Sequence, residues 1–162
     1  MSEKKWGQNV FYPIIVLLGV ILGQIVFGYF ASPYAPNFFI SYAAFLLVTS
    51  ASLIQLAFLF CVFLIFAPLE THAVFYPLAF LMSVIATYAV VRIYFEKGSY
   101  YGTAIASGLL TVGTYSLYYI AVRIIIGEVW PLYTLRIIGA ETIFNIALAV
   151  VMTVIGKRYT QR

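Results

Sequence analysis

A glutamate and an asparagine stand four residues apart in the apolar stretch GAETIFNIAL, residues 139–148. Because residues at this spacing share one helix face, Glu141 and Asn145 would present a carboxylate and a carboxamide together. Burying an ionisable group in a membrane costs about 2.5–3.5 kcal/mol, which makes Glu141 a functional candidate. Two interpretations stay open. The pair binds a partner or ligand, or it serves packing and the start of the last helix, where the dipole favours a glutamate in the first turn.

Two further pairs of charged or titratable residues could do chemistry. Glu70 and His72, in PLETHAV, are two residues apart and so do not share a helix face. With no nucleophile motif beside them, a surface turn is favoured over a catalytic dyad. Arg92 and Glu96 are one turn apart and could form an ion pair. With one cysteine and one histidine in the chain, we expect no metal centre, no cofactor and no catalytic residue.

Small residues one helical turn apart form a second kind of candidate. Gly19 and Gly23 lie in GVILG, with Gln24 beside them as an interhelical hydrogen-bonding group. Ala104 and Gly108 repeat the spacing later in the chain. Such motifs pack helices within a bundle or against a partner's helix, and both readings stay open. Three hydroxyl residues near the second motif can bond to carbonyls one turn back or to a neighbouring helix: Thr111, Thr114 and Ser116.

The composition indicates which elements must position these residues. The chain has 162 residues, of which 64% are hydrophobic and 9% charged, whereas soluble domains have about 25% charged residues. The mean hydropathy is +1.03. So much apolar surface calls for lipid as the solvent, and in lipid a helical bundle satisfies the backbone. The net charge of +4 is small and scattered, which argues against a nucleic-acid partner. We expect one membrane domain over residues 1–162.

The apolar runs predict six membrane-spanning helices. The first is longer than the roughly 7–15-residue apolar core of a secretory signal, so we expect it to be retained. The uncharged run 37–68 is long for one span and short for two, and we expect it to form two shortened helices that turn near Ser50. The expected helices cover about residues 10–30, 38–49, 51–67, 73–95, 103–126 and 138–155.

The basic residues predict the orientation of these helices. If the N-terminus is cytoplasmic, seven of the nine basic residues face the cytoplasm: Lys4, Lys5, Arg92, Lys97, Lys157, Arg158 and Arg162. Only Arg123 and Arg136 then face outward. This bias follows the positive-inside rule and favours both termini in the cytoplasm. Merging the second and third helices gives five spans and reverses the loops after them, so the bias favours six.

Three segments together carry a family resemblance. ETIFNIALAVVMTVIGKRY, residues 141–159, places Asn145 before small and apolar residues and a basic end. YAPNFFISYAAFLL, residues 34–47, begins an apolar segment with proline and polar residues. VVRIYFEKGSYYGTAIASGLL, residues 90–110, contains a charged turn after the fourth expected helix. With six spans and both termini inside, the chain resembles the rod shape-determining protein MreD family.

The resemblance implies a function without catalysis. The protein would not be an enzyme. It would be a scaffold subunit of the bacterial cell-elongation machinery, which carries out lateral peptidoglycan synthesis at the cytoplasmic membrane. Its implied partners are membrane lipid, the bitopic scaffold protein MreC, MreB filaments, and the RodA synthase with its transpeptidase partner.

The fold of that family is similar to the substrate-binding subunits of energy-coupling-factor transporters, and this supplies the alternative function. The protein would then capture a vitamin or other small molecule. Such a subunit would have an outer pocket lined by tyrosines and by four polar residues: Glu70, His72, Glu141 and Asn145.

Overall fold

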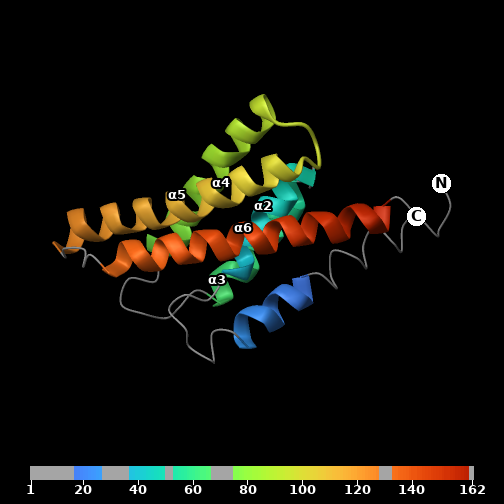
Figure 1. Ribbon diagram of the computed structural model, residues 1–162. Coiled ribbons are helices and arrows are strands. Elements are labelled where there is room, and N and C mark those ends of the chain that lie inside the picture. Colours follow the sequence, from blue (N-terminus) through green and yellow to red (C-terminus); the bar gives the residue numbers. More distant parts are fainter. Residues whose placement is uncertain (1–16, 27–36, 50–52, 67–74, 128–132, 161–162) are drawn as a thin grey trace.

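The described residues of the chain are mainly helical. The computed structural model describes residues 17–26, 37–49, 53–66, 75–127 and 133–160. Over these residues it has six helices and no strand, which confirms the all-α expectation. The helices are Leu17–Val26, α2 Phe38–Thr49, α3 Leu53–Phe66, α4 Phe75–Tyr94, α5 Tyr100–Ile126 and α6 Tyr133–Thr160 (Figure 1).

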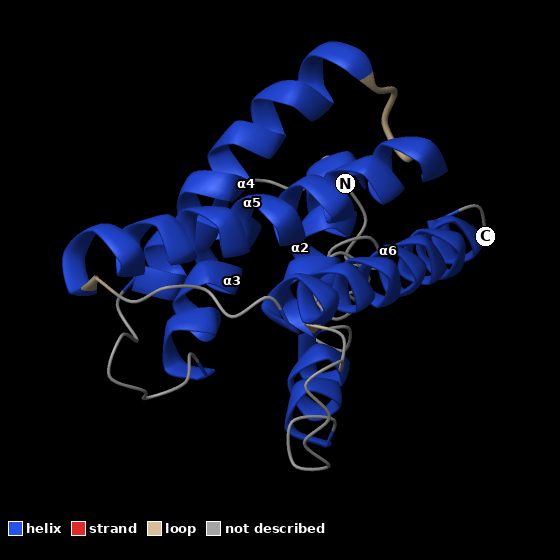
Figure 2. Ribbon diagram, turned by 60° about the vertical axis from the view of Figure 1, so that its left-hand side comes forward, coloured by secondary structure: helices blue, strands red, loops and turns tan. Residues whose placement is uncertain are grey.

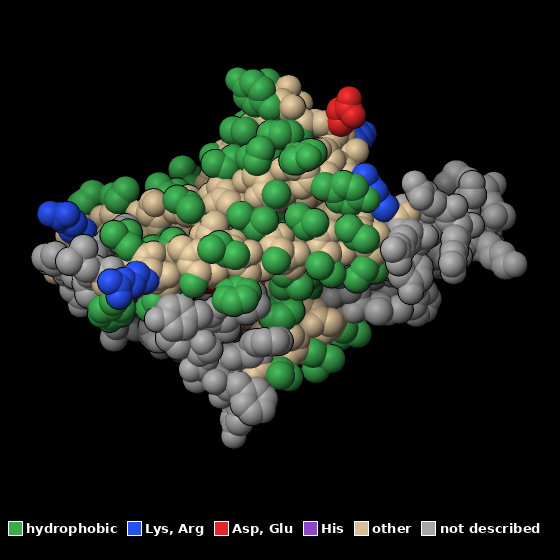
Figure 3. Space-filling model, viewed as in Figure 1, with side chains coloured by type: hydrophobic (Ala, Val, Ile, Leu, Met, Phe, Trp, Pro, Cys, Tyr) green, Lys and Arg blue, Asp and Glu red, His purple; other side chains and the backbone are tan. Residues whose placement is uncertain are grey.

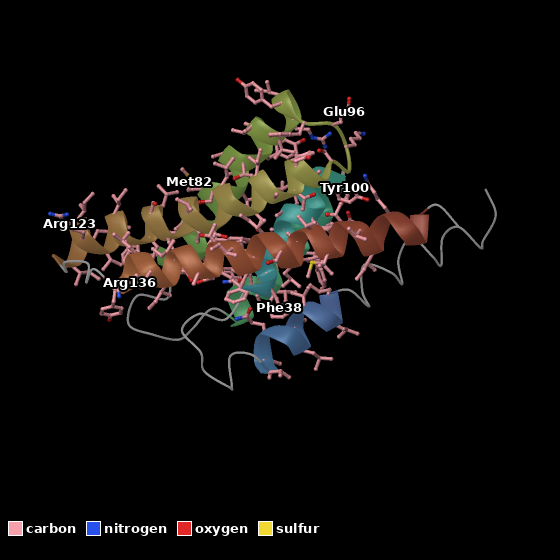
Figure 4. The ribbon with its side chains drawn as sticks, viewed as in Figure 1. Phe38, Met82, Glu96, Tyr100, Arg123 and Arg136 are labelled. Carbon is pink, nitrogen blue, oxygen red and sulfur yellow. The ribbon has the colours of Figure 1, made fainter. Side chains whose placement is uncertain are left out.

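Three helices, α4, α5 and α6, are long and apolar enough to cross a membrane. No more than 33% of the most apolar window of each is buried in the bundle, so most of their apolar residues face outward. Figure 3 shows hydrophobic side chains covering the middle of one face, with Lys and Arg towards its two ends. Arg123 and Arg136 lie at one end, and Glu96 and Tyr100 at the other (Figure 4). This distribution is typical of a multi-pass membrane protein.

Local signals fix both ends of α5. Gly98 has a φ of 72° in the turn after α4, a conformation that glycine adopts without steric cost. Ser99 is the N-cap of α5, and its side chain accepts a hydrogen bond from the Gly102 N–H. At the other end Gly127 is left-handed, with a φ of 79°, and its N–H bonds to the Arg123 carbonyl. The turn between α4 and α5 is therefore tightly defined.

Helix α2 is the buried centre of the bundle. It has 12 residues, about 18 Å at 1.5 Å per residue, which is too short to cross the roughly 30 Å hydrocarbon core. Ten consecutive residues, Phe39 to Val48, are buried. A helix that is hydrophobic all round belongs inside a bundle. It packs on α5 and α6 and also touches α3 and α4 (Figure 1, Figure 2).

Six helices were expected, with the second and third shortened, and six are described. The run 37–68 does hold two short helices, of 12 and 14 residues, and α2 matches the expected bounds 38–49. Within the described residues α4, α5 and α6 are the helices that reach spanning length. The remainder of the expected helix 10–30, and the turn near Ser50, lie outside the described residues. Helix α6, Tyr133–Thr160, extends beyond the expected 138–155 at both ends.

The two glycines of the GVILG motif have different surroundings. A Cβ built on Gly23 would lie 2.6 Å from the ring of Phe38, the first residue of α2. The neighbouring Gln24 accepts a hydrogen bond from the Phe38 N–H at 3.0 Å. Gly19 is exposed, and a Cβ there would meet nothing within 4 Å. Gly23 and Gln24 therefore hold the first helix against the start of α2, whereas Gly19 faces away.

We expect Gly23→Leu to destabilise the protein by about 1–3 kcal/mol, because the new side chain must displace the Phe38 ring from a packed site. Gly19→Leu is the matched control, with the same change in the same helix but open space around it, and should leave stability unchanged. Thermal unfolding of both variants in detergent measures the difference. Equal unfolding temperatures would contradict the placement of Gly23 against α2.

Candidate functional site

A line of polar contacts, the polar seam, joins α5 to α6. The Thr153 hydroxyl donates to Thr103 at 3.1 Å, the Asn145 amide donates to Thr111 at 3.0 Å, and the Tyr115 hydroxyl donates to Glu141 at 2.5 Å. The three contacts are separated by eight and then four residues on α5. On α6 the separations are the same, but the residue numbers decrease. The two helices are thus antiparallel with matched spacing, and polar side chains bond across lipid-embedded helices as they do here.

Asn145 lies at the middle of the polar seam and is fully buried. Its carboxamide oxygen accepts from the Asn37 N–H at 2.7 Å and lies 3.4 Å from the Ser41 hydroxyl. Its amide nitrogen donates to Thr111 and lies 3.5 Å from a Glu141 oxygen. An asparagine side chain offers two acceptor and two donor positions. Both donor positions and one acceptor position are therefore used, on Thr111 of α5, Glu141 of α6 and Asn37 directly before α2.

The N–H groups at the start of α2 are the main donors in these hydrogen bonds. A helix leaves its first four N–H groups without partners in its own backbone. Here the Asn37 N–H bonds to Asn145 and the Phe38 N–H bonds to Gln24. The Asn37 side-chain oxygen, at the N-cap, accepts from the N–H groups of Phe39 and Ile40 at 3.1 and 3.2 Å. The start of α2 therefore lies inside the bundle with every backbone donor satisfied.

Glu141 lies at one side of this cluster among tyrosines. It is 4% exposed, and its bond from Tyr115 has the length of a charge-assisted hydrogen bond. The Tyr115 ring lies 5.6 Å from that of Tyr76, whose hydroxyl accepts from the Asn37 amide at 3.3 Å. Tyr118 and Tyr119 extend the ring cluster. Glu141 and Asn37 are thus linked through Asn145 on one side and approached by tyrosines on the other.

The expected position of Glu141 in the first turn of the last helix is wrong. Helix α6 begins at Tyr133, and its first turn holds no acid. Glu141 follows eight residues later, about 12 Å along the axis at 1.5 Å per residue. The residues before 138 continue the helix instead of forming a loop, and this carries the carboxylate into the bundle. Glu141 therefore serves the polar seam and not the start of α6.

The remaining residues singled out from the sequence lie outside the polar contacts around Glu141 and Asn145, apart from Thr111, or outside the described residues. Gly108 packs on α6, where a Cβ would lie 3.6 Å from Ile146, and Ala104 is half-buried one turn earlier. Thr111 bonds to the Ser107 carbonyl one turn back, as expected, but the buried Thr114 hydroxyl has no hydrogen-bond partner. The Arg92 guanidinium lies over the Tyr88 ring, with no ion pair to Glu96 in the described part of the chain. Glu70 and His72 lie outside the described residues.

The sequence analysis did not single out several residues of the site: Asn37, Ser41, Tyr76, Thr103, Tyr115, Tyr118, Tyr119 and Thr153. Asn37 carried a usable signal, since asparagine is a favoured N-cap and here directly precedes the apolar run. The pairing of Tyr115 with Glu141 carried none, because it depends on how α5 and α6 are aligned.

This arrangement of polar groups serves to hold helices together through hydrogen bonds. Its donors and acceptors point at one another, and the best-bonded residue, Asn145, is neutral. Among the described residues no three His, Cys, Asp or Glu side chains lie together as a metal site would require. Comparisons of the chain with protein-family models, with curated proteins and with solved structures found no match.

We expect Asn145→Leu to destabilise the protein more than Glu141→Gln. The leucine leaves the Asn37 N–H without its acceptor and Thr111 without its donor, and a buried group left unsatisfied costs about 1–3 kcal/mol. Glutamine at 141 keeps an oxygen for Tyr115, so we expect a loss below about 1 kcal/mol. Thermal unfolding in detergent, followed by size-exclusion chromatography, measures both. Wild-type stability in Asn145→Leu would refute the assigned role.

Proposed function

We propose that this protein is a non-catalytic membrane scaffold subunit of the bacterial cell-elongation machinery, related to the MreD family. The observation that carries the proposal is the mutual bonding of the buried polar groups, with Asn145 tying α6 to α5 and to the start of α2. Because these polar groups are hydrogen-bonded to one another, they favour a structural role over a catalytic one. The resemblance of the chain to that family supplies the biological setting.

The exposed side of the first helix is where we place the partner's membrane helix. Leu18 and Leu22 are 53% and 61% exposed, and Gly19 lies between them with open space around its Cα. A glycine on an apolar helix surface allows another helix to approach closely. In this proposal the partner is the single membrane helix of MreC. MreB, RodA and the transpeptidase partner of RodA would associate through the same complex.

We also propose that both termini are cytoplasmic and that the protein lies in the bacterial cytoplasmic membrane. The described basic residues separate into two groups, with Arg123 and Arg136 at the end where α5 meets α6. The second group lies at the other end of the bundle. Arg92 is in the last turn of α4, Lys97 is in the turn after α4, and Lys157 is in the last turn of α6. The positive-inside rule assigns the second group, with the basic chain termini, to the cytoplasm.

One observation favours a second function, that of a substrate-binding subunit of an energy-coupling-factor transporter. Glu141 and the tyrosines gather polar and aromatic groups of the kind that bind small molecules. Under this alternative a vitamin would occupy the neighbourhood of Glu141 and Tyr115. This alternative also proposes that the chain has a fold similar to that of the substrate-binding subunits of those transporters.

The orientation predicts the behaviour of reporter fusions. A reporter that is active only in the cytoplasm should be active when fused after residue 162 or in the turn at Gly98. A reporter active only outside should work when inserted between α5 and α6. The reverse pattern would invert the assignment of the two charged ends.

The scaffold function predicts which partner is recovered on purification. Wild-type protein purified from a rod-shaped host should bring MreC with it, and Gly19→Leu should recover much less while keeping its stability. Gly139→Leu is the matched control, because Gly139 is also exposed with nothing within 4 Å of a built Cβ. It should recover MreC as the wild type does.

Depletion of the protein should turn rod-shaped cells round. If cells keep their shape, and native mass spectrometry finds a tightly bound vitamin in place of MreC, the scaffold proposal is wrong and the transporter function takes its place.

A further inference from the structure

A second site lies at the other end of α2. A pocket of about 270 Å³ opens between the end of α2, the end of α4 and the turn that follows α4. This is slightly below the roughly 300–1,000 Å³ of pockets for drug-sized ligands, so it suits a compact group. Its apolar lining is buried or half-buried, whereas three charged residues at its mouth are exposed. The lining residues are Leu47, Val48, Val91, Phe95 and the charged Arg92, Glu96 and Lys97.

The cations at this mouth are available to a ligand. Lys97 has no hydrogen-bond or ionic partner within the described chain, and Arg92 contacts only the Tyr88 ring, at 5.0 Å. Glu96 forms no ion pair with either of them there, and Figure 4 shows it beside the turn that follows α4. Lys157 lies close by, since its Cε would be 3.2 Å from a Cβ on Gly98. The Lys157 ammonium is engaged over the Tyr100 ring, at 4.1 Å. Among the charged residues that line the pocket, two cations against one acid make it attractive to an anion.

The end of α2 itself does not use these cations. The Val48 carbonyl accepts a hydrogen bond from the Gly98 N–H at 2.9 Å. The Phe45 carbonyl accepts one from the Thr49 hydroxyl at 2.7 Å. Because the turn and a side chain already bond the carbonyls at this helix end, Arg92 and Lys97 remain free to meet something from outside.

The length of α4 sets the depth at which the pocket would lie in a membrane. At 1.5 Å per residue its 20 residues span about 30 Å, the thickness of the hydrocarbon core, so a pocket at its end falls at the level of the lipid headgroups. It sits where α4 ends, at the opposite end of the bundle from Arg123 and Arg136 (Figure 4). The C-terminal end of α4 diverges from α5 in both ribbon views (Figure 1, Figure 2). Basic pockets between membrane helices on the cytoplasmic side suit anionic headgroups. Leu78 and Ile85 lie fourteen and seven residues before Arg92, on the same helix face, and are 51% and 59% exposed.

We propose that this pocket binds the headgroup of an anionic phospholipid, with its phosphodiester between Arg92 and Lys97. The acyl chains then run along the exposed apolar face of α4 past Ile85 and Leu78. The apolar lining, including Val91 and Phe95, takes the glycerol region. The site is separate from the polar seam and does not depend on the scaffold function, because it rests on the pocket, its unpaired cations and its depth.

The test compares two double variants of the full-length protein. Arg92→Gln with Lys97→Gln removes both cations of the pocket. Arg123→Gln with Arg136→Gln removes two cations from the opposite end and serves as the matched control. Each protein is reconstituted in nanodiscs of phosphatidylcholine with increasing phosphatidylglycerol. Retained phosphatidylglycerol is counted by native mass spectrometry, and its apparent affinity is taken from the rise in unfolding temperature.

We expect the wild type and the control to retain phosphatidylglycerol and to be stabilised by it. A basic side chain at an anionic surface contributes about fivefold, so the pocket variant should bind about 25-fold more weakly. An equal loss in both double variants would show bulk charge attraction, and no loss in the pocket variant would exclude the site. Either result overturns the proposal.

Two further measurements keep the result unambiguous. Inorganic phosphate is added to protein in phosphatidylcholine alone, and stabilisation as strong as that by phosphatidylglycerol would assign the pocket to free phosphate and overturn the lipid. If the double pocket variant does not fold, Lys97→Gln alone replaces it, since this side chain has no bonded partner among the described residues. Its apparent affinity should fall about fivefold, and an unchanged affinity would again overturn the proposal.

Discussion

The start of a helix inside a lipid-embedded bundle is the constraint on which the rest of this structure depends. The first N–H groups of α2 are half-buried to buried, and a backbone group left unsatisfied within a membrane costs several kcal/mol. Acceptors must therefore arrive from elsewhere, and they come as Gln24 from the first helix and Asn145 from α6. Asn37 supplies the remaining acceptor from within its own segment. Gln24, Asn37 and Asn145 therefore together bond the first N–H groups of α2.

The same constraint accounts for the buried carboxylate. A helix start carries a partial positive charge, which favours an anion nearby. Glu141 lies one turn from Asn145 on α6, and Asn145 bonds directly to the first N–H of α2. The hydroxyl of Tyr115 supplies a hydrogen bond from the other side. A neutral amide thus connects the acid to the helix start, and the Tyr115 hydroxyl gives one of its oxygens a hydrogen bond.

The sequence allowed much of the fold to be predicted and little of the site. Prolines, charges and apolar runs placed α2 near residues 38–49, because these signals are local. Local signals did not give the length of α6, since the residues before 138 read equally well as loop or helix. They also did not give the partners of Asn145. Its bonds to Asn37, 108 residues away, and to Thr111, 34 residues away, arise only when three helices are packed.

The two ends of α2 are held in different ways. At its start, side chains from other helices supply the acceptors, so that end is locked to α6 and to the first helix. At its end, Gly98 of the turn after α4 binds the Val48 carbonyl, and exposed cations stand beside a pocket. One end thus fixes the bundle while the other keeps charged groups available.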